Sequence, residues 1–288
     1  MSEFWKRTIF GAIYVAAVVG SILWCAEAFL VLSSVLAVLA VREYNRLTHP
    51  FYWADVCGGV CAALLCVIAY SVEHWSTISY DAGYVSIVIA CAAGLYLGLM
   101  AAAVIGELWH PEGHPMADWG NLFIGQIMIA LPFGLMNGLS GMGKYLLLAI
   151  FILIWVNDTG AYCVGSLTAK RKNGNHKMFV RVSPKKSWEG LFGGLALAVG
   201  VGALLASFGW FDGLNIYINR YVIGMLFALI VGVFGTLGDL IESLIKRSVG
   251  VKDSGKFLPG HGGVLDRFDS VLLAAPAAML FLILISNM

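Results

Sequence analysis

Long apolar runs constrain this sequence more than any other feature, because a helix needs roughly 20 mainly apolar residues to cross a bilayer. Nine such segments lie approximately at residues 8–24, 28–41, 54–71, 82–106, 121–139, 145–167, 188–209, 221–244 and 268–286. Of the 288 residues, 60% are hydrophobic and only 12% are charged, whereas soluble domains carry about 25% charged residues. We therefore expect an all-α, polytopic membrane protein of about nine transmembrane helices.

Basic residues are distributed unevenly between the loops, and this asymmetry predicts the orientation of the chain. If the N-terminus is cytoplasmic and the nine segments alternate, 16 of the 18 Lys and Arg residues face the cytoplasm. The two exceptions are Lys144 and Arg220. Because basic residues in short loops stay on the cytoplasmic side, the charge distribution and an odd number of spans support each other.

Five carboxylates gather in the cytoplasmic half of the later apolar segments, where a charge costs about 2.5–3.5 kcal/mol on insertion scales. They are Asp158, Asp239, Glu242, Asp266 and Asp269. Two pairs of them are spaced three residues apart, so each pair is expected to share one face of a helix. Paired carboxylates are typical ligands of Mg²⁺, which predicts a site for one or two cations. Ion pairs, such as Glu242 with Lys246, are the alternative interpretation.

Two basic loops predict binding of a phosphate-rich ligand. The first contains Lys252 and the glycine-rich residues 260–263, where backbone N–H groups can approach an anion. In the second, Ser183 is expected to cap a helix with Pro184 at its first position. A helix N-terminus near lysines favours an anion. The alternative for both is a solvated basic loop without a ligand.

Two shorter patterns bear on helix packing and metal binding. Gly190 and Gly194 are four residues apart, a spacing that predicts close contact between helices. His110 and His114 are also four residues apart. The Pro and Gly residues between the two histidines oppose a helix there, so no metal site is expected from this histidine pair.

Residues 243–269 carry the longest motif in the sequence. It reads Ser-Leu-Ile-Lys-Arg, four residues, Lys-Asp-Ser-Gly, two residues, and Leu-Pro-Gly-His-Gly-Gly-Val-Leu-Asp-Arg-Phe-Asp. All 27 positions resemble the signature of the phosphatidate cytidylyltransferases. Residues 155–162, 183–190 and 238–243 are similar to other segments of that family, so the specific resemblance covers about residues 155–270.

The resemblance implies an enzyme of phospholipid biosynthesis that converts CTP and phosphatidate into CDP-diacylglycerol and pyrophosphate and requires Mg²⁺. It also implies metal binding by Asp239 and Asp266. From the residues themselves we add Asp269, Asp158 and Glu242 to the cation ligands, with room for a second cation. The residues assigned to catalysis are Asp239, Asp266, Asp269, Lys246 and Arg247. The residues assigned to substrate binding are Lys186, Ser187, Lys252, Asp253, His261, Gly262, Gly263 and Arg267.

The expected organisation follows from these assignments. Residues 1–144 hold spans 1–5 and are expected to line a lipid cavity or act as a scaffold, and residues 145–288 hold the catalytic spans 6–9 with both basic loops. The expected partners are CTP, phosphatidate and membrane lipid, with no nucleic acid. Members of the family are often dimeric, so a homodimer is included. The expected location is a bacterial cytoplasmic membrane with the active site facing the cytoplasm.

Two other functions are alternatives. Intramembrane carboxylates also serve ion-coupled transporters, but transporter sites lie near the bilayer midplane within interrupted helices. Four of the five carboxylates here lie at helix ends beside basic loops, which favours an enzyme. A CTP-dependent lipid kinase or another lipid nucleotidyltransferase shares the chemistry, and only the identity of the product distinguishes it.

Overall fold

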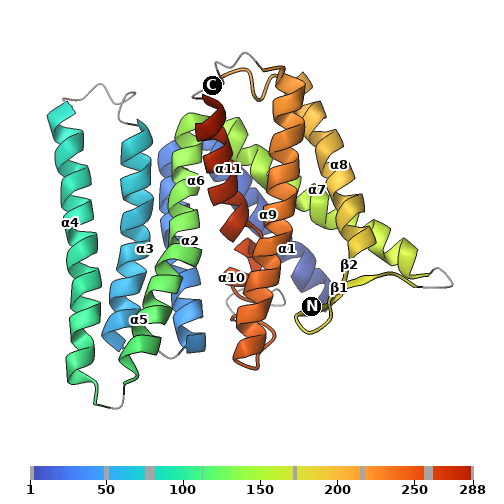
Figure 1. The fold of residues 1–288 in the computed structure, drawn as a ribbon. Helices are drawn as coiled ribbons and strands as arrows, with labels where there is room; N and C mark the ends of the chain where they lie inside the picture. Colours follow the sequence, from blue (N-terminus) through green and yellow to red (C-terminus); the bar gives the residue numbers. More distant parts are fainter. Residues whose placement is uncertain are drawn as a thin grey trace. The chain divides into compact units, whose positions relative to one another are not determined.

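The computed structural model describes residues 3–48, 52–74, 82–111, 113–170, 174–214, 218–255 and 262–286, and most of them are helical (Figure 1). The helices are α1 (Glu3–Trp24), α2 (Ala26–Thr48), α3 (Tyr52–Glu73), α4 (Ala82–Gly106), η2 (Glu107–Trp109), α5 (Pro115–Ile124), η3 (Gly125–Ala130), α6 (Leu131–Met142), α7 (Lys144–Ala169), α8 (Trp188–Ser207), α9 (Arg220–Ser248), α10 (Leu265–Phe268) and α11 (Val271–Ser286). The strands are β1 (Lys177–Phe179) and β2 (Ser183–Ser187). Each predicted apolar segment lies in helical structure to within a few residues, which confirms the predicted fold class.

Among the described residues, seven helical segments are long and apolar enough to cross a membrane. They are Trp53–Glu73, Val85–Trp109, Pro115–Met142, Lys144–Ala169, Trp188–Ser207, Arg220–Ser248 and Leu265–Ser286. The first two predicted spans are helical but weaker. The apolar part of α1 is only Thr8–Trp24. The last turns of α2 carry Arg42, Glu43 and Arg46, and these charges lower its mean hydropathy.

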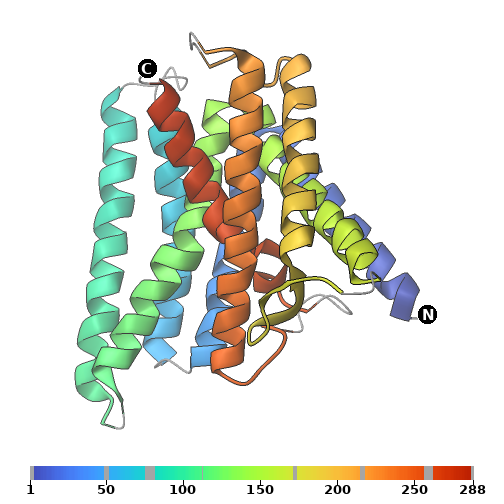
Figure 2. The ribbon, with the colours of Figure 1, turned by 45° about the vertical axis from the view of Figure 1, so that its right-hand side comes forward.

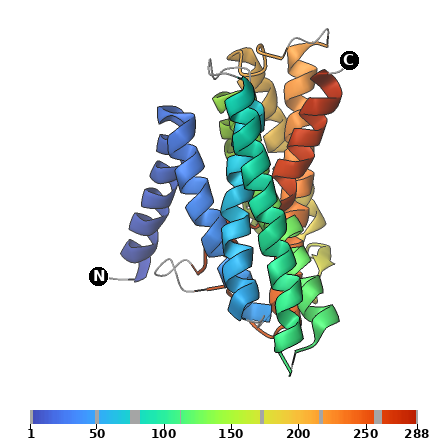
Figure 3. The same cartoon turned by 90° about the vertical axis from the view of Figure 1, so that its left-hand side faces the viewer.

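The chain forms two compact units, and the first comprises residues 1–144 and 253–268. Within it α2 packs against α1, α3 and α6, and α3 packs against α4 and α6; Figure 3 shows α1 and α2 side by side in blue. Amide side chains form hydrogen bonds between these helices. Gln126 donates to the Gly58 carbonyl at 3.0 Å, and Asn137 donates to Ser33 Oγ at 2.9 Å. Such hydrogen bonds hold helices together where apolar burial alone gives little specificity.

The second unit comprises residues 145–252 and 269–288. Here α9 packs against both α8 and α11, as Figure 2 shows. Small residues allow α8 to approach α7 closely. A Cβ atom at Gly190 would lie 2.8 Å from the Ala161 carbonyl oxygen, and one at Gly194 would lie 2.5 Å from that of Asn157. The helix contact predicted from the spacing of these two glycines is confirmed.

The start of α8 differs from the prediction. Ser183 lies in strand β2, which pairs antiparallel with β1, and therefore does not cap a helix. The cap is Ser187, whose Oγ accepts a hydrogen bond from the Gly190 N–H at 3.2 Å. The prediction was wrong because strand pairing satisfies the backbone of residues 183–187, so the helix begins only after the hairpin ends.

The last span also differs from the prediction. Asp266 and Asp269 were expected on one continuous helix, but α10 ends at Phe268 and α11 begins at Val271. Asp269 lies in the turn between them, where its Oδ1 accepts a hydrogen bond from the Ser270 N–H at 2.6 Å. This local bond offers the backbone an alternative to continuing the helix. Asp266 belongs to the first unit and Asp269 to the second.

Candidate active site

The second unit contains a cavity of about 340 Å³ with charged side chains in its wall. It is lined by residues of α7, the β1–β2 hairpin, α8 and α9, namely Asp158, Ala161, Tyr162, Met178, Lys185, Lys186, Ser187, Gly190, Leu191, Thr236 and Asp239. Two carboxylates, two lysines and the hydroxyl of Ser187 therefore share one cavity. Because α7, α8 and α9 are membrane-length helices, this charged cavity opens in an otherwise apolar bundle.

Asp239 is the best-connected carboxylate of the cavity. Lys186 Nζ lies 2.8 Å from its Oδ2 and also donates to the Thr236 carbonyl at 3.3 Å. Ser243 Oγ, one turn further along α9, donates to its Oδ1 at 3.3 Å. These contacts hold Asp239 in one orientation and bring Lys186 of the hairpin onto α9. The sequence assigned both residues to the site, and the structure places them in direct contact.

Asp158 and Asp269 lie within electrostatic range of Asp239. Asp158 comes from α7, and Asp269 is carried by the turn before α11. This turn reaches α9 at Gly238, where an added Cβ atom would lie 2.6 Å from the Asp269 carbonyl oxygen. A glycine at position 238 is therefore required for the close approach. Three of the five predicted carboxylates are thus brought together within one unit.

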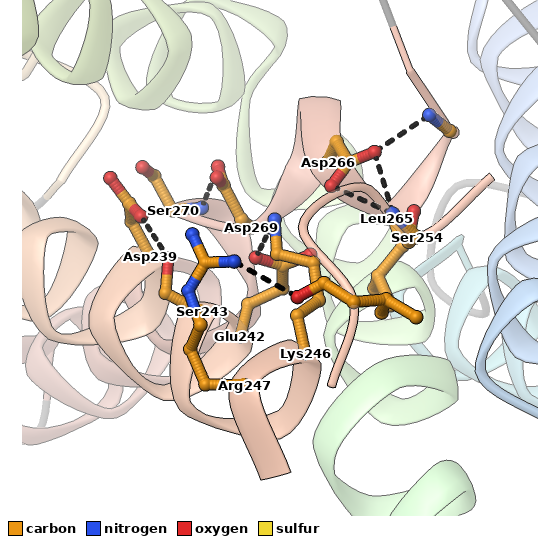
Figure 4. Close-up of polar contacts among 12 residues, drawn as sticks. Asp239, Glu242, Ser243, Lys246, Arg247, Ser254, Leu265, Asp266, Asp269 and Ser270 are labelled. Atoms are coloured by element: carbon orange, nitrogen blue, oxygen red, sulfur yellow. Dashed lines mark hydrogen bonds and ion pairs between the residues drawn. The ribbon is translucent and has the colours of Figure 1, made fainter. Parts of the chain in front are cut away.

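Glu242 and Lys246 form a separate ion pair on α9, with Lys246 Nζ 2.6 Å from Glu242 Oε2. The Glu242 side chain is 0% exposed. This is the ion pair that the sequence offered as the alternative to a cation site. Arg247 is exposed, and its Nη1 donates to the Val251 carbonyl at 3.0 Å. Figure 4 shows these contacts at the end of α9. The assignment of Glu242 to a cation and of Lys246 and Arg247 to catalysis remains a prediction.

In the first unit, Asp266 organises the end of the signature loop. Its carboxylate accepts hydrogen bonds from the Ser254 N–H at 3.0 Å and from the Gly263 N–H at 2.7 Å (Figure 4). Gly262 has a φ of 85°, a conformation that glycine adopts without strain. Asp266 therefore holds the backbone at Ser254 close to the backbone at Gly263.

Glu43 also binds this part of the chain, and the sequence did not predict that contact. It lies on α2 and is buried, and its carboxylate accepts three hydrogen bonds. The donors are Ser254 Oγ at 3.0 Å, the Val264 N–H at 3.0 Å and the Leu265 N–H at 2.9 Å. The last two N–H groups stand at the start of α10, where a carboxylate is favoured. The position of Glu43 just after an apolar run was the signal in the sequence, because a charge at such a position requires a partner.

The other described residues assigned to substrate binding differ in their exposure to solvent. Lys252, Asp253 and Arg267 are exposed, and Gly263 is buried beside Glu43. His261 lies outside the described residues. The roles of these residues in substrate binding stay predictions.

The second-unit cavity combines two kinds of chemistry. Asp158 and Asp239 line the cavity, and Asp269 lies within electrostatic range of Asp239. These carboxylates offer only oxygen ligands, which Mg²⁺ prefers. Lys185, Lys186 and the Ser187 hydroxyl offer positive charge and a hydrogen-bond donor, which suit phosphate oxygens. A cavity of this kind fits a polyanionic ligand together with a hard cation.

The fold and the cavity define an all-helical, polytopic membrane protein with a charged site set among membrane-length helices. The profile of a cytidylyltransferase family matches residues 5–285. Because this match extends over nearly the whole sequence, the chain belongs to the cytidylyltransferase family.

Similar proteins occur in staphylococci. The chain is 41% identical over 140 residues to a phosphatidate cytidylyltransferase of Staphylococcus epidermidis (strain ATCC 35984), and the aligned part is 49% of each chain. It is 43% identical over 141 residues to the phosphatidate cytidylyltransferases of Staphylococcus haemolyticus (strain JCSC1435) and Staphylococcus aureus (strain COL), covering 49% of this chain and 50% of the relatives. The chain spans about half the length of the curated relatives it matches.

Proposed function

We propose that the protein is a phosphatidate cytidylyltransferase, which transfers the cytidylyl group of CTP to phosphatidate and releases pyrophosphate. Family membership and the names of the staphylococcal relatives support this proposal. The structural observation that carries it is the second-unit cavity, in which Asp158 and Asp239 lie beside Lys186 and Ser187. Such a site suits the joining of two phosphate compounds, one of which is anchored in the membrane.

The carboxylates of the cavity fit a divalent cation. Lys186 is the basic residue that contacts Asp239, and the carboxylates of Asp158 and Asp269 add further negative charge to the same region. A magnesium ion, with or without a second cation, would offset this charge and also neutralise phosphate oxygens of the nucleotide. We assign the cation to Asp158, Asp239 and Asp269. The assignment of Asp266 rests on the sequence, through its spacing to Asp269 and the family resemblance.

The reaction requires little covalent chemistry from the protein. A phosphate oxygen of phosphatidate attacks the α-phosphorus of CTP and forms a new P–O bond. The bond from the α-phosphorus to the β-bridging oxygen breaks, and pyrophosphate leaves with the electron pair. The lipid phosphate is already an anionic nucleophile, so catalysis depends on positioning and electrostatic stabilisation.

The chain's own residues have distinct tasks in this proposal. Lys186 places its positive charge in the cavity and offsets charge on a phosphate group. Ser187 accepts a hydrogen bond from Gly190, and its hydroxyl hydrogen is directed to a phosphate oxygen, since a hydroxyl accepts and donates at once. The apolar surfaces of the surrounding helices keep the acyl chains of the lipid in the membrane.

The location and partners follow from the same assignment. Bacterial relatives and apolar helices support a bacterial membrane, and we propose the cytoplasmic membrane with the cavity facing the cytoplasm. CTP and phosphatidate are the substrates. A homodimer remains part of the proposal.

The destination of the label from CTP tests this function against its alternatives. Purified protein in detergent receives phosphatidate and Mg²⁺ with CTP labelled on the α- or the γ-phosphorus. Cytidylyl transfer puts the α-label into lipid and the γ-label into pyrophosphate. A lipid kinase would put the γ-label into lipid, and an ion-coupled transporter would transfer neither. Either of the last two results would overturn the proposal.

A further inference from the structure

The loop joining α4 to α5 holds a second group of potential cation ligands, separate from the residues assigned to nucleotide chemistry. Glu107 lies in η2, directly after α4, His110 follows it, and Asp118 lies in the first turn of α5. One ligand atom from each lies within 4.8 Å of one atom from each of the others. Side-chain atoms from residues before and after a tight turn thus lie close enough together to share one ion.

Glu107 is the observation that points to a ligand. Its side chain is only 3% exposed, and within the described part of the chain neither of its carboxylate oxygens accepts a hydrogen bond. His110 Nδ1 lies 3.4 Å from Oε2. Burial of a carboxylate without donors is unfavourable unless a positive charge compensates it. We therefore expect a bound cation to supply this compensating positive charge.

The backbone of the turn keeps this centre open. The His110 N–H donates to the Glu107 carbonyl at 3.1 Å, and the Gly113 N–H donates to the His110 carbonyl at 3.1 Å. A Cβ atom at position 113 would lie 2.6 Å from both Glu107 Oε2 and His110 Nδ1. Asp118 is held by the His114 N–H, which donates to its Oδ2 at 2.9 Å. Glycine at 113 leaves the space between the side chains free.

We propose that Glu107, His110 and Asp118 form a binding site for a divalent cation of the zinc class. Zinc accepts both imidazole and carboxylate ligands, whereas magnesium prefers an all-oxygen set. Zinc sits about 2.0–2.2 Å from such ligands, so two ligand atoms of one ion are at most about 4.4 Å apart, and small side-chain rotations suffice. The ion joins the end of α4 to the start of α5. This proposal is independent of the proposed function.

Zinc binding by the full chain tests the site. Protein purified in detergent is stripped with a chelator and equilibrated with micromolar Zn²⁺ in excess Mg²⁺, and bound zinc is measured by mass spectrometry. We expect one zinc ion for the wild type and for the control His114→Ala. Glu107→Gln and His110→Ala should each weaken zinc affinity at least tenfold. Equal zinc binding by all four proteins, or no zinc bound by the wild type, would overturn the site.

A second measurement avoids any variant that fails to fold. Diethyl pyrocarbonate modifies accessible histidines, and peptide mass spectrometry reports each position in the wild-type protein. Zinc should protect His110 severalfold and leave the exposed His114 reactive. Equal reactivity of His110 with and without zinc would contradict the proposal.

Discussion

At the scale of single residues, carboxylates do two different things in this protein. Asp239 carries a lysine contact and lines a cavity, which suits binding of charged ligands. The carboxylate of Glu43 instead accepts hydrogen bonds from the Ser254 hydroxyl and from the backbone N–H groups of Val264 and Leu265, which suits a structural role. Both side chains end in a carboxylate, so the partners of that group decide its function.

Glu43→Gln should loosen the signature loop. The amide would turn an N–H₂ group toward backbone N–H donors, and we expect a loss of about 2–4 kcal/mol in unfolding free energy. Arg42→Gln is the matched control, because Arg42 is half exposed and pairs with Asp55 at 3.5 Å, a contact worth about 1 kcal/mol or less. Denaturant unfolding in detergent measures both changes. Equal losses for the two variants would show that Glu43 does not hold the loop.

The sequence revealed part of this residue-level chemistry. Asp158, Asp239 and Asp269 were recognised because a carboxylate at the end of an apolar run needs a partner. Glu43 was missed although it follows the same rule. Its hydrogen-bond partner Ser254 is 211 residues away in the sequence, and no local pattern links two positions so far apart. The partners of a buried charge are set by tertiary packing.

At the scale of elements, the long helices were predictable and their ends were not. Nine apolar runs indicate helices directly, because backbone groups in a membrane must be satisfied internally. Helix ends depend on competing local bonds. Ser187 rather than Ser183 starts α8 because the preceding residues pair as a strand. The Asp269–Ser270 turn interrupts the last span through a hydrogen bond between neighbouring residues.

The contact of α9 with this turn can be tested with two alanines. Gly238→Ala should displace the turn, since the added Cβ atom would lie 2.6 Å from the Asp269 carbonyl oxygen, and we expect a 10- to 100-fold lower kcat, on the order of the cost of a misplaced group. Gly235→Ala has nearest contacts of 3.6–3.8 Å and gains the same helix propensity, so near-normal turnover is expected. If both variants keep wild-type activity, the turn does not position Asp269 for catalysis.

At the scale of the whole molecule, hydropathy and charge determine how the chain lies in the membrane. Sixteen of the 18 basic residues fall on one side in the nine-span arrangement, and this asymmetry supports a cytoplasmic N-terminus. The same arrangement would put both basic loops on the cytoplasmic side, as the proposed use of CTP requires. Neither compact unit is continuous in the sequence, because residues 253–268 belong to the first unit and residues 269–288 to the second.

Labelling of single cysteines tests this orientation. In a background without the six native cysteines, Lys185→Cys and Asp212→Cys offer exposed positions on opposite predicted sides. A membrane-impermeant maleimide applied to intact cells should label position 212 and reach position 185 only after the membrane is permeabilised. The reverse pattern would place the charged cavity on the outer side and contradict the proposed use of CTP.

The central claim is that the carboxylates of the second-unit cavity support cytidylyl transfer. The most direct measurement is the rate of CDP-diacylglycerol formation by purified wild type, Asp239→Asn and Asp212→Asn, each with Mg²⁺ and with EDTA. Asp212 pairs with Arg220 at 3.2 Å and is exposed, so its variant is the matched control. We predict Mg²⁺-dependent product from the wild type and the control, and a rate lower by about 100-fold or more for Asp239→Asn. Wild-type rates from Asp239→Asn, or product formation in EDTA, would contradict the account.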